Sequence, residues 1–181
     1  MSALAKYCLH KGIKVSGSDK TKSHITDELT HLGANIFYKH QRKNVLGASM
    51  VVYTCAVGEN NVEVVFARQN NILTLERADF LAQITKNYKT VIAVAGSHGK
   101  TTVCGMIASV LTEAQKEPTV MVGGETNFGN LILGKTDFLV VEACEYREHF
   151  LKLNHDIGII TNIDFDHPDY FKTNVEYEKS F

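Results

Sequence analysis

Residues 91–102 read Val-Ile-Ala-Val-Ala-Gly-Ser-His-Gly-Lys-Thr-Thr, an apolar run that ends in a turn between two glycines. The apolar run predicts a buried strand, and apolar residues at helical spacing over 103–111 predict a helix after the turn. Gly96 and Gly99 can adopt backbone angles closed to other residues, which lets main-chain N–H groups converge on an anion. The helix N-terminus adds positive partial charge at the same place. The segment therefore predicts a phosphate cradle at a strand end in an α/β fold.

The spacing of this turn differs from the usual phosphate-binding pattern, G-x-x-x-x-G-K-[ST], because Val94 stands where the first glycine would be. The local pattern is the shorter G-x-x-G-K-T-T of residues 96–102, the phosphate loop. The alternative is a glycine turn with a solvated lysine, but the flanking strand and helix favour a triphosphate site. In such a site Lys100 adds a full charge and the Thr101 hydroxyl can ligate Mg²⁺.

Length, charge and cysteine usage narrow the class of protein. A chain of 181 residues can hold one domain or two small ones. The net charge of −1 gives no indication of a nucleic-acid partner. The four cysteines include no C-x-x-C pair, which favours a reduced, cytoplasmic setting. No apolar run approaches the roughly 20 residues that a membrane span needs, so we expect no membrane association.

Predicted helices and strands alternate along the whole chain. The helices are predicted at 3–11, 23–32, 61–69, 77–85, from the phosphate loop to about 114, and at 175–181. The strands are predicted at 13–16, 35–38, 49–54, 72–75, 91–95, 119–122, 137–142 and 157–163. This alternation predicts a mostly parallel sheet with both faces covered.

A polar break at residues 86–89 predicts a domain boundary. Residues 1–88 are then a Rossmann-like unit and residues 89–181 part of a P-loop ATPase domain. The first helix lacks the strand and glycine turn that normally open a Rossmann unit, and Phe181 falls inside a predicted helix. We therefore expect a piece of a longer enzyme, with open sheet edges that favour self-association.

Polar residues follow three of the predicted strands, and ligands of open parallel sheets lie at such carboxyl ends. Glu142 is placed where Mg²⁺ finds a hard oxygen beside phosphates, although an exposed strand-end acid is the alternative. Three aspartates and a histidine between 164 and 169 indicate either a second metal or phosphate site or a solvated turn. Ser18 and Asp19 either contact a ribose or base, as in Rossmann units, or form an ordinary turn.

Three blocks stand in order along the chain: GSHGKTT at 96–102, VVEACEY at 140–146 and TNIDFDHPDYF at 161–171. Together with the opening MSALAKYCLHKGIKVSGSD, they resemble the Mur ligase family of peptidoglycan synthesis over essentially the whole chain. The similarity is greatest to the members that add L-alanine to UDP-N-acetylmuramate.

The resemblance implies a three-domain enzyme whose domains bind, in order, the UDP-sugar, ATP and the incoming amino acid. Residues 1–88 would be the UDP-sugar-binding domain without its leading strand and glycine turn. Residues 89–181 would be the first part of the central ATP-binding domain. The third domain, which would bind L-alanine, would be absent, and the piece would be inactive alone.

The resemblance also implies a mechanism, in which the lactoyl carboxylate of the sugar attacks the γ-phosphate of ATP and L-alanine then attacks the acyl phosphate. By resemblance, Lys100 contacts the β- and γ-phosphates, Thr101 and Glu142 bind one Mg²⁺, and the catalytic residue His167 binds a second. The other nucleotide-binding residues would be Gly96, Ser97, His98, Gly99, Thr102 and Asn162. Many relatives carry aspartate where this chain has Cys144, so Glu145 is not expected to be a ligand.

Three other functions fit parts of this pattern. A recycling Mur ligase would attach a tripeptide to the same sugar. A truncated paralogue would bind nucleotide without ligase activity. A P-loop kinase would phosphorylate a small molecule, but it gives no reason for the Rossmann-like unit.

Overall fold

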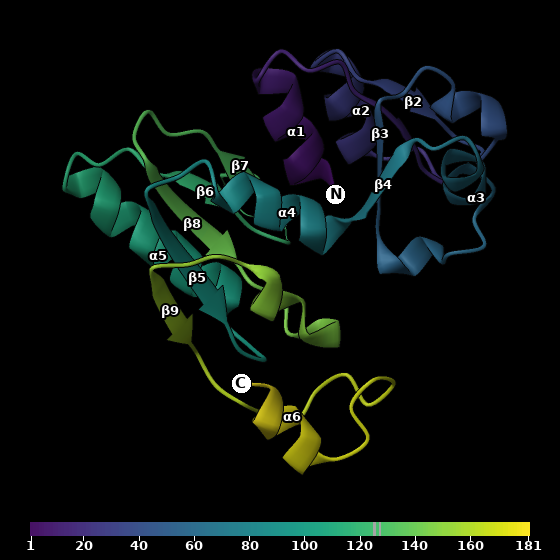
Figure 1. Cartoon of the computed structure of the whole chain (residues 1–181). Helices are drawn as coiled ribbons and strands as arrows, with labels where there is room; N and C mark the ends of the chain where they lie inside the picture. Colours follow the sequence, from purple (N-terminus) through teal and green to yellow (C-terminus); the bar gives the residue numbers. More distant parts are fainter. Residues whose placement is uncertain (125, 127) are drawn as a thin grey trace. The chain divides into compact units, whose positions relative to one another are not determined.

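The computed structural model describes residues 1–124, 126 and 128–181 and divides into two compact units, Met1–Phe80 and Leu81–Phe181 (Figure 1). Both units are α/β, and all strand pairs but one are parallel, as predicted. The division falls inside the helix α4 (Arg77–Thr85). The sequence places a domain boundary at residues 86–89, and that assignment stays a prediction.

The first unit contains two separate parallel pairs of strands, β1 with β2 and β3 with β4. Its elements in chain order are α1 (Ser2–His10), β1 (Ser16–Ser18), α2 (His24–His31), β2 (Asn35–Phe37), the 3₁₀ segment η1 (Arg42–Val45), β3 (Met50–Tyr53), η2 (Cys55–Val57), α3 (Val62–Gln69) and β4 (Leu73–Glu76). Helix and strand alternate because each parallel pair needs a crossover, which α2 and α3 supply.

Short-range signals set the helix ends in this unit. Ser23 and Thr26 cap the start of α2 reciprocally, each side-chain oxygen accepting from the other residue's backbone N–H. Asn61 caps α3 through its side-chain oxygen. Helices α1 and α2 end two residues before Gly12 and Gly33, which both have positive φ. The predicted helix boundaries are confirmed within one or two residues.

The predicted strand at 13–16 is wrong in its position, because β1 occupies Ser16–Ser18. Its register is fixed by parallel pairing with β2, in which Gly17 lies opposite Ile36. The Asp19 N–H continues the pairing by donating to the Phe37 carbonyl at 2.9 Å. Ser18 therefore belongs to the strand itself, and the turn begins at Asp19.

The described residues of the second unit form a five-stranded sheet in the order β7-β6-β8-β5-β9, with helices and loops around it. Its elements are β5 (Thr90–Ala95), α5 (Lys100–Glu113), β6 (Thr119–Met121), β7 (Leu131–Ile132), β8 (Phe138–Glu142), the 3₁₀ segment η3 (Tyr146–Lys152), β9 (Ile157–Ile160) and α6 (Asn174–Ser180). Helix α5 lies along the sheet and packs against β5 and β8 (Figure 1). The core here is apolar and centred on Val94, Cys104 and Val140.

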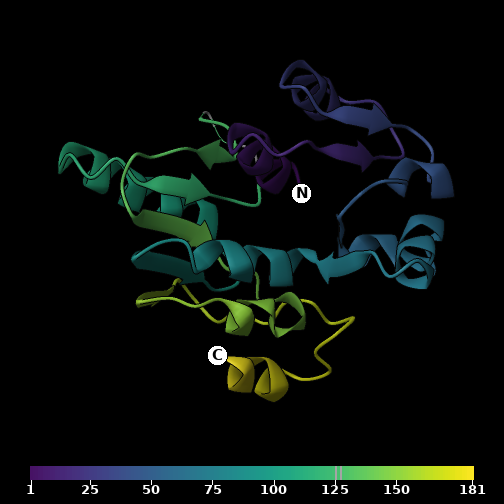
Figure 2. The same cartoon turned by 45° about the horizontal axis from the view of Figure 1, so that its top comes forward.

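Two features of the second unit differ from the sequence-based expectation. The short strand β7, which pairs antiparallel with β6, was not predicted, because two residues carry too little pattern. Strand β9 ends at Ile160 rather than at residue 163, since residues 161 and 162 bond to the loop that follows β5. After β9 the chain continues to α6, which lies next to η3 (Figure 2) through stacked rings of Phe150 and Phe181.

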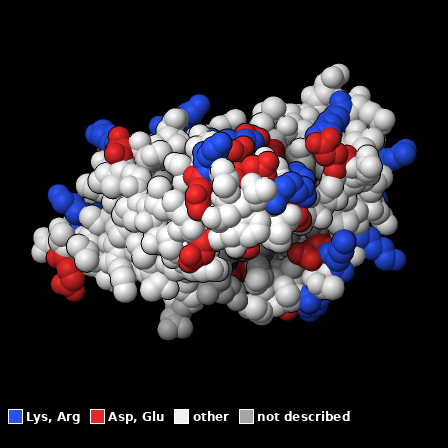
Figure 3. Space-filling model, turned by 90° about the horizontal axis from the view of Figure 1, so that it is seen from below, with Lys and Arg blue, Asp and Glu red and all other residues white. Residues whose placement is uncertain are grey.

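No helix in the described part of the chain is both long and apolar enough to cross a membrane. Acidic and basic side chains are interspersed on the face drawn in Figure 3. This mixture agrees with the net charge of −1.

Replacing Ser23 by alanine removes the oxygen that accepts from the Thr26 N–H at the start of α2. We expect Ser23→Ala to lower the free energy of unfolding by about 1 kcal/mol. Urea denaturation followed by circular dichroism measures this loss. Ser49→Ala, at an exposed serine outside the helices, is the control. Equal losses in the two variants would contradict the capping role.

Candidate functional site

The phosphate loop joins the end of β5 to the start of α5, and both of its glycines have a positive φ. Gly96 has φ +119°, and a Cβ atom there would lie 2.2 Å from the Thr161 hydroxyl oxygen and 2.8 Å from the Asn162 carbonyl oxygen. Gly99 has φ +80° and is the N-cap residue of α5, with open space around its Cα. A side chain is therefore excluded at Gly96 by contact and conformation, and disfavoured at Gly99 by conformation alone.

Residues that follow β9 hold the first half of the loop. The Ser97 N–H donates to the Asn162 carbonyl at 3.1 Å, and the His98 N–H donates to Asn162 Oδ1 at 3.0 Å. Asn162 Nδ2 and Thr161 Oγ1 both donate to the His98 carbonyl, at 3.0 and 2.7 Å. Both polar atoms of the Asn162 side chain, Oδ1 and Nδ2, thus form hydrogen bonds with the loop backbone.

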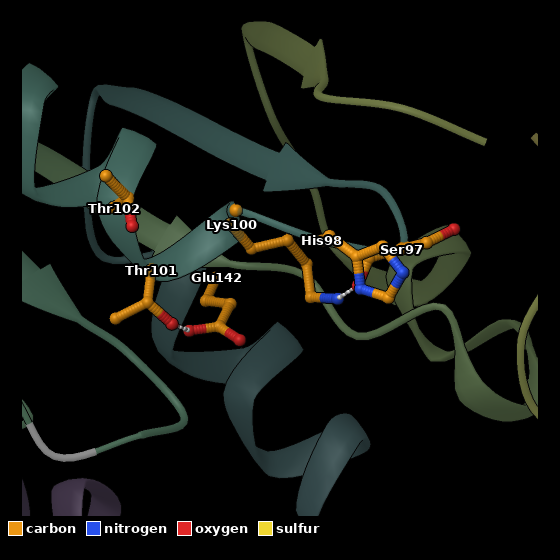
Figure 4. A pocket seen from close by; sticks show the side chains of 7 residues that line it. Ser97, His98, Lys100, Thr101, Thr102 and Glu142 are labelled. Carbon is orange, nitrogen blue, oxygen red and sulfur yellow. Dashed lines mark hydrogen bonds between the residues drawn. The ribbon is translucent and has the colours of Figure 1, made fainter. Parts of the chain in front are cut away.

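The second half of the loop keeps its donors available. The N–H groups of residues 99–102 have no acceptor within the described residues, as is usual for a helix N-terminus without a side-chain cap. Residues 97–102 and Glu142 line a pocket of about 330 Å³ (Figure 4). The structure therefore brings residues 97–102 of the phosphate loop and the predicted metal ligand Glu142 into one pocket. The predicted residues Gly96 and Asn162 are not part of this lining; they meet where Asn162 holds the loop backbone.

Thr101 and Glu142 form an oxygen pair in this pocket. Thr101 Oγ1 donates to Glu142 Oε2 at 2.8 Å, and the Gly123 N–H donates to the same oxygen at 2.9 Å. Glu142 is the last residue of β8, opposite Val94 in β5, so the parallel register places it beside the loop. A hydroxyl next to a carboxylate supplies hard oxygens of the kind Mg²⁺ prefers. Burial, and then the charge of Glu142, raises the pKa of Cys104 to about 12, so this nearby thiol stays protonated.

Lys100 points back across its own loop rather than toward Glu142 (Figure 4). Its Nζ donates to the carbonyls of Gly96 at 2.5 Å and Ser97 at 3.1 Å, and it lies 2.9 Å from Glu145 Oε2. Glu145 is 2% exposed, so its charge is compensated almost entirely inside the protein. The Lys100 ammonium group is therefore held in place by a buried carboxylate.

The other oxygen of Glu145 reaches His167. Glu145 Oε1 lies 3.1 Å from His167 Nε2, and Asp166 Oδ2 lies 3.9 Å from the same nitrogen. Ligand atoms of Glu145, Asp166 and His167 all lie within 4.8 Å of one another and could hold a cation. The motif resemblance gives Glu145 no role, so sequence reasoning missed this residue. The available signal was a second acid in VVEACEY, three positions after Glu142.

The polar segment 164–169 is not one cluster. Asp166 and His167 join Glu145, whereas Asp169 accepts a hydrogen bond from the Tyr146 hydroxyl at 2.8 Å. Asp164 meets the phosphate loop through its backbone, which bonds to the Ser97 hydroxyl. His167 also has a positive φ of 55°, a conformation uncommon outside glycine.

Two family models together match nearly the whole chain. The model described as "Mur ligase family, catalytic domain" matches residues 1–89, and the "Mur ligase middle domain" matches residues 94–181. The chain belongs to the Mur ligase family.

Curated relatives within the family include two clostridial enzymes named UDP-N-acetylmuramate–L-alanine ligase. The Clostridium tetani protein is 48% identical over 95% of this chain, and the Clostridium acetobutylicum protein is 43% identical over 100% of this chain. The chain spans 38% and 40% of the length of these two relatives.

Solved structures of the family superpose on nearly all of this Mur ligase chain. The UDP-N-acetylmuramate-alanine ligase of Thermotoga maritima matches with a TM-score of 0.89 and 32% identity, over 99% of this chain and 43% of that one. The UDP-N-acetylmuramate:L-alanyl-gamma-D-glutamyl-meso-diaminopimelate ligase of Neisseria meningitides matches with a TM-score of 0.83 and 23% identity, over 99% of this chain and 62% of that one. The second likeness supports the fold alone.

The predicted substrate residues Ser18 and Asp19 lie in the first unit, where an internal network engages Ser18. Its hydroxyl donates to Glu63 Oε1 at 2.6 Å and accepts from Asn44 Nδ2 at 3.1 Å. Asp19 is exposed, and its Oδ1 accepts from the Thr21 N–H at 3.2 Å, as in an ordinary turn. Their role in substrate binding stays a prediction.

Glu63 is the centre of this network. Its carboxylate also accepts from Asn44 Nδ2 at 2.7 Å and the Gln41 N–H at 3.1 Å, and it lies 2.9 Å from His40 Nδ1. Burial alone would raise the pKa of Glu63, but the hydrogen bonds from Ser18, His40, Asn44 and Gln41 outweigh burial and lower it. The ionised carboxylate therefore stabilises the unit.

We expect Gly96→Ala to lower the free energy of unfolding by more than about 2 kcal/mol, because the new Cβ meets Thr161 and Asn162. Gly99→Ala is the matched control, since it adds a Cβ at positive φ in open space and should cost only about 1–2 kcal/mol. Thermal and urea unfolding measure both. An equal cost at the two positions would show that the contact with residues 161 and 162 is unimportant.

The lowered pKa of Glu63 predicts a loss of stability in acid. The ionised form contributes stability that is fully present above the unfolded-state pKa of about 4.3 and declines as pH falls through the lower folded-state value. The urea concentration at the unfolding midpoint of the wild type should therefore decrease as the pH is lowered from 6 to 3. Glu63→Gln should be less stable at pH 6 and show a shallower fall. An unchanged slope in the variant would rule out this linkage.

Proposed function

We propose that this chain is the UDP-sugar- and ATP-binding part of a cytoplasmic ligase that joins L-alanine to the lactoyl carboxylate of UDP-N-acetylmuramate in peptidoglycan synthesis. The observation that carries the proposal is the single pocket lined by Lys100, the Thr101–Glu142 oxygen pair and the open N–H groups of residues 99–102. The names of relatives 43–48% identical to this chain support the choice of substrates. Because the chain spans about two fifths of those relatives, the amino-acid site is proposed to lie in the remainder.

Positive charge in the pocket would allow two anions to react. The carboxylate of the sugar and the γ-phosphate of ATP repel one another, so the site must neutralise charge while it aligns them. Lys100 would exchange the Gly96 and Ser97 carbonyls for the β- and γ-phosphates. The N–H groups of residues 99–102 would bind phosphate oxygens at the positive end of α5.

The oxygen donors suit Mg²⁺. Thr101 and Glu142 would hold one ion, and His167 with Glu145 and Asp166 would hold a second. When bound, Mg²⁺ supplies charge neutralisation at the phosphates. Thr101 and Glu142 are thus proposed as ligands of the first ion and Glu145, Asp166 and His167 as ligands of the second. Asn162 and residues 96–102 are proposed as the ATP site.

In the proposed reaction the lactoyl carboxylate attacks the γ-phosphorus, and ADP leaves as an acyl phosphate forms. The amine of L-alanine then attacks the acyl carbon, and inorganic phosphate leaves. Lys100 and the loop N–H groups hold the phosphoryl charge throughout the first step. The first unit, with Ser18 and Asp19 at the end of β1, is proposed to bind the UDP-sugar.

Amino-acid transfer by the whole protein tests the substrate. Purified protein with UDP-N-acetylmuramate, MgATP and radiolabelled L-alanine should give one labelled product with release of phosphate. Product with a tripeptide and none with L-alanine would identify a recycling ligase. MgATP binding without either product would identify a nucleotide-binding module.

Lys100→Ala tests the site in the 181-residue chain itself. Loss of a charged hydrogen-bond donor to phosphate should weaken MgATP binding about 10- to 100-fold. Isothermal titration calorimetry measures this change. Lys135→Ala, at a side chain 82% exposed in the same unit, is the control and should bind as the wild type does. Equal affinity in Lys100→Ala and the wild type would refute the assignment of the pocket.

A further inference from the structure

A buried tyrosine hydroxyl contacts the phosphate loop from outside the pocket. Tyr177, on α6, is 0% exposed, and its hydroxyl oxygen lies 2.6 Å from the Ser97 hydroxyl oxygen. Neither the motif resemblance nor the pocket lining includes Tyr177. Burying a phenol hydroxyl costs free energy unless the hydroxyl forms a hydrogen bond, and Ser97 supplies the partner for the Tyr177 hydroxyl.

The protons in this contact can be assigned. Ser97 Oγ lies 2.5 Å from the Asp164 carbonyl, which can only accept, so the single Ser97 hydroxyl proton goes there. The Asp164 N–H donates to Ser97 Oγ at 2.9 Å. Tyr177 is therefore the donor to Ser97, and burial raises the pKa of Tyr177, which keeps that proton in place. Ser97 Oγ thus donates one hydrogen bond and accepts two.

Aromatic packing fixes the ring that carries this hydroxyl. The Tyr177 ring lies 5.0 Å from that of Phe171, 5.4 Å from that of Phe181 and 6.0 Å from that of Phe165, in edge-on geometry. Phe181 in turn stacks on Phe150 of η3 at 5.0 Å. The ring is held by apolar contacts, and its hydroxyl meets the loop.

Ser97 connects this hydroxyl to the proposed chemistry. The Ser97 carbonyl accepts from Lys100 Nζ, and its N–H is bound to Asn162. The hydrogen bond from Tyr177 restrains the Ser97 side chain in addition to its backbone. Ser97 lies two residues before the unbonded N–H groups of residues 99–102, so its restraint limits the movement of this part of the loop. Pre-set donors bind an anion more tightly than donors that must be ordered first.

We propose that Tyr177 is a positioning residue for the phosphate loop, which sets the nucleotide affinity through Ser97 without touching the nucleotide. This inference rests on the proposed ATP site. It also assigns a role to the α6 segment, which lies outside the pocket.

The test uses Tyr177→Phe in the 181-residue chain, because phenylalanine keeps the ring contacts and removes the donor. We expect the MgATP dissociation constant, measured by calorimetry, to rise about 3- to 10-fold. Tyr170→Phe is the matched control, since Tyr170 is 40% exposed in the same segment, and it should bind as the wild type does. Circular dichroism confirms that each variant is folded at the temperature of the titration.

A double-mutant cycle separates positioning from general stabilisation. Ser97→Ala should weaken binding, and adding Tyr177→Phe to it should change the affinity no further, because the two side chains act as one unit. A further loss of the same size in the Ser97→Ala background would overturn the inference, as would unchanged affinity in Tyr177→Phe alone.

A readout without nucleotide keeps this inference separate from the proposed function. In ¹⁵N-resolved spectra, Tyr177→Phe should shift the N–H resonances of residues 96–99 more than Tyr170→Phe does. Absence of MgATP binding in the wild type would refute the ATP site, and these spectra would still decide whether Tyr177 positions the phosphate loop. Unshifted loop resonances would overturn it.

Discussion

The close approach of residues 161 and 162 to Gly96 is the contact on which the rest of the site depends. It occurs because β9 runs parallel to β5, so that the chain leaving β9 meets the loop leaving β5. Asn162 then binds the N–H groups of Ser97 and His98 and directs the next turn into α5. The N–H groups that remain unbonded are those at the helix N-terminus, where positive partial charge is concentrated. One strand pairing thus determines which donors can meet a phosphate.

Burial of Glu145 explains how a lysine and a histidine from distant parts of the chain are held near the same point. A buried carboxylate is stable only if its charge is compensated, and Lys100 and His167 approach one oxygen each. The sequence pattern draws attention to Glu142, which the structure places with Thr101. The two acids of the block VVEACEY therefore contact different side chains, although they are three residues apart: Glu142 bonds to Thr101, and Glu145 lies against Lys100 and His167.

The local sequence was sufficient where the structure depends on near neighbours. The caps at Ser23 and Asn61 and the helix ends before Gly12 and Gly33 follow from residues within a few positions of one another. The local sequence was insufficient for the positions of strands, because the register of pairing with a neighbouring strand sets them. The first strand lies two to three residues later than the predicted strand at 13–16, since pairing with β2 fixes its backbone hydrogen bonds. The antiparallel strand β7 is too short to show a pattern at all.

By itself, the sequence determined the α/β alternation, the strand–loop–helix that carries Lys100 and Thr101, the Glu142 strand end and membership of the Mur ligase family. Only the tertiary structure decided that Glu145 pairs with Lys100 and His167, that Glu63 engages Ser18, and that Tyr177 reaches Ser97. The physical reason is range. Propensities, caps and glycine conformations act over a few residues, whereas these contacts join residues 22 to 80 positions apart and exist only after the strands have paired and the core has closed.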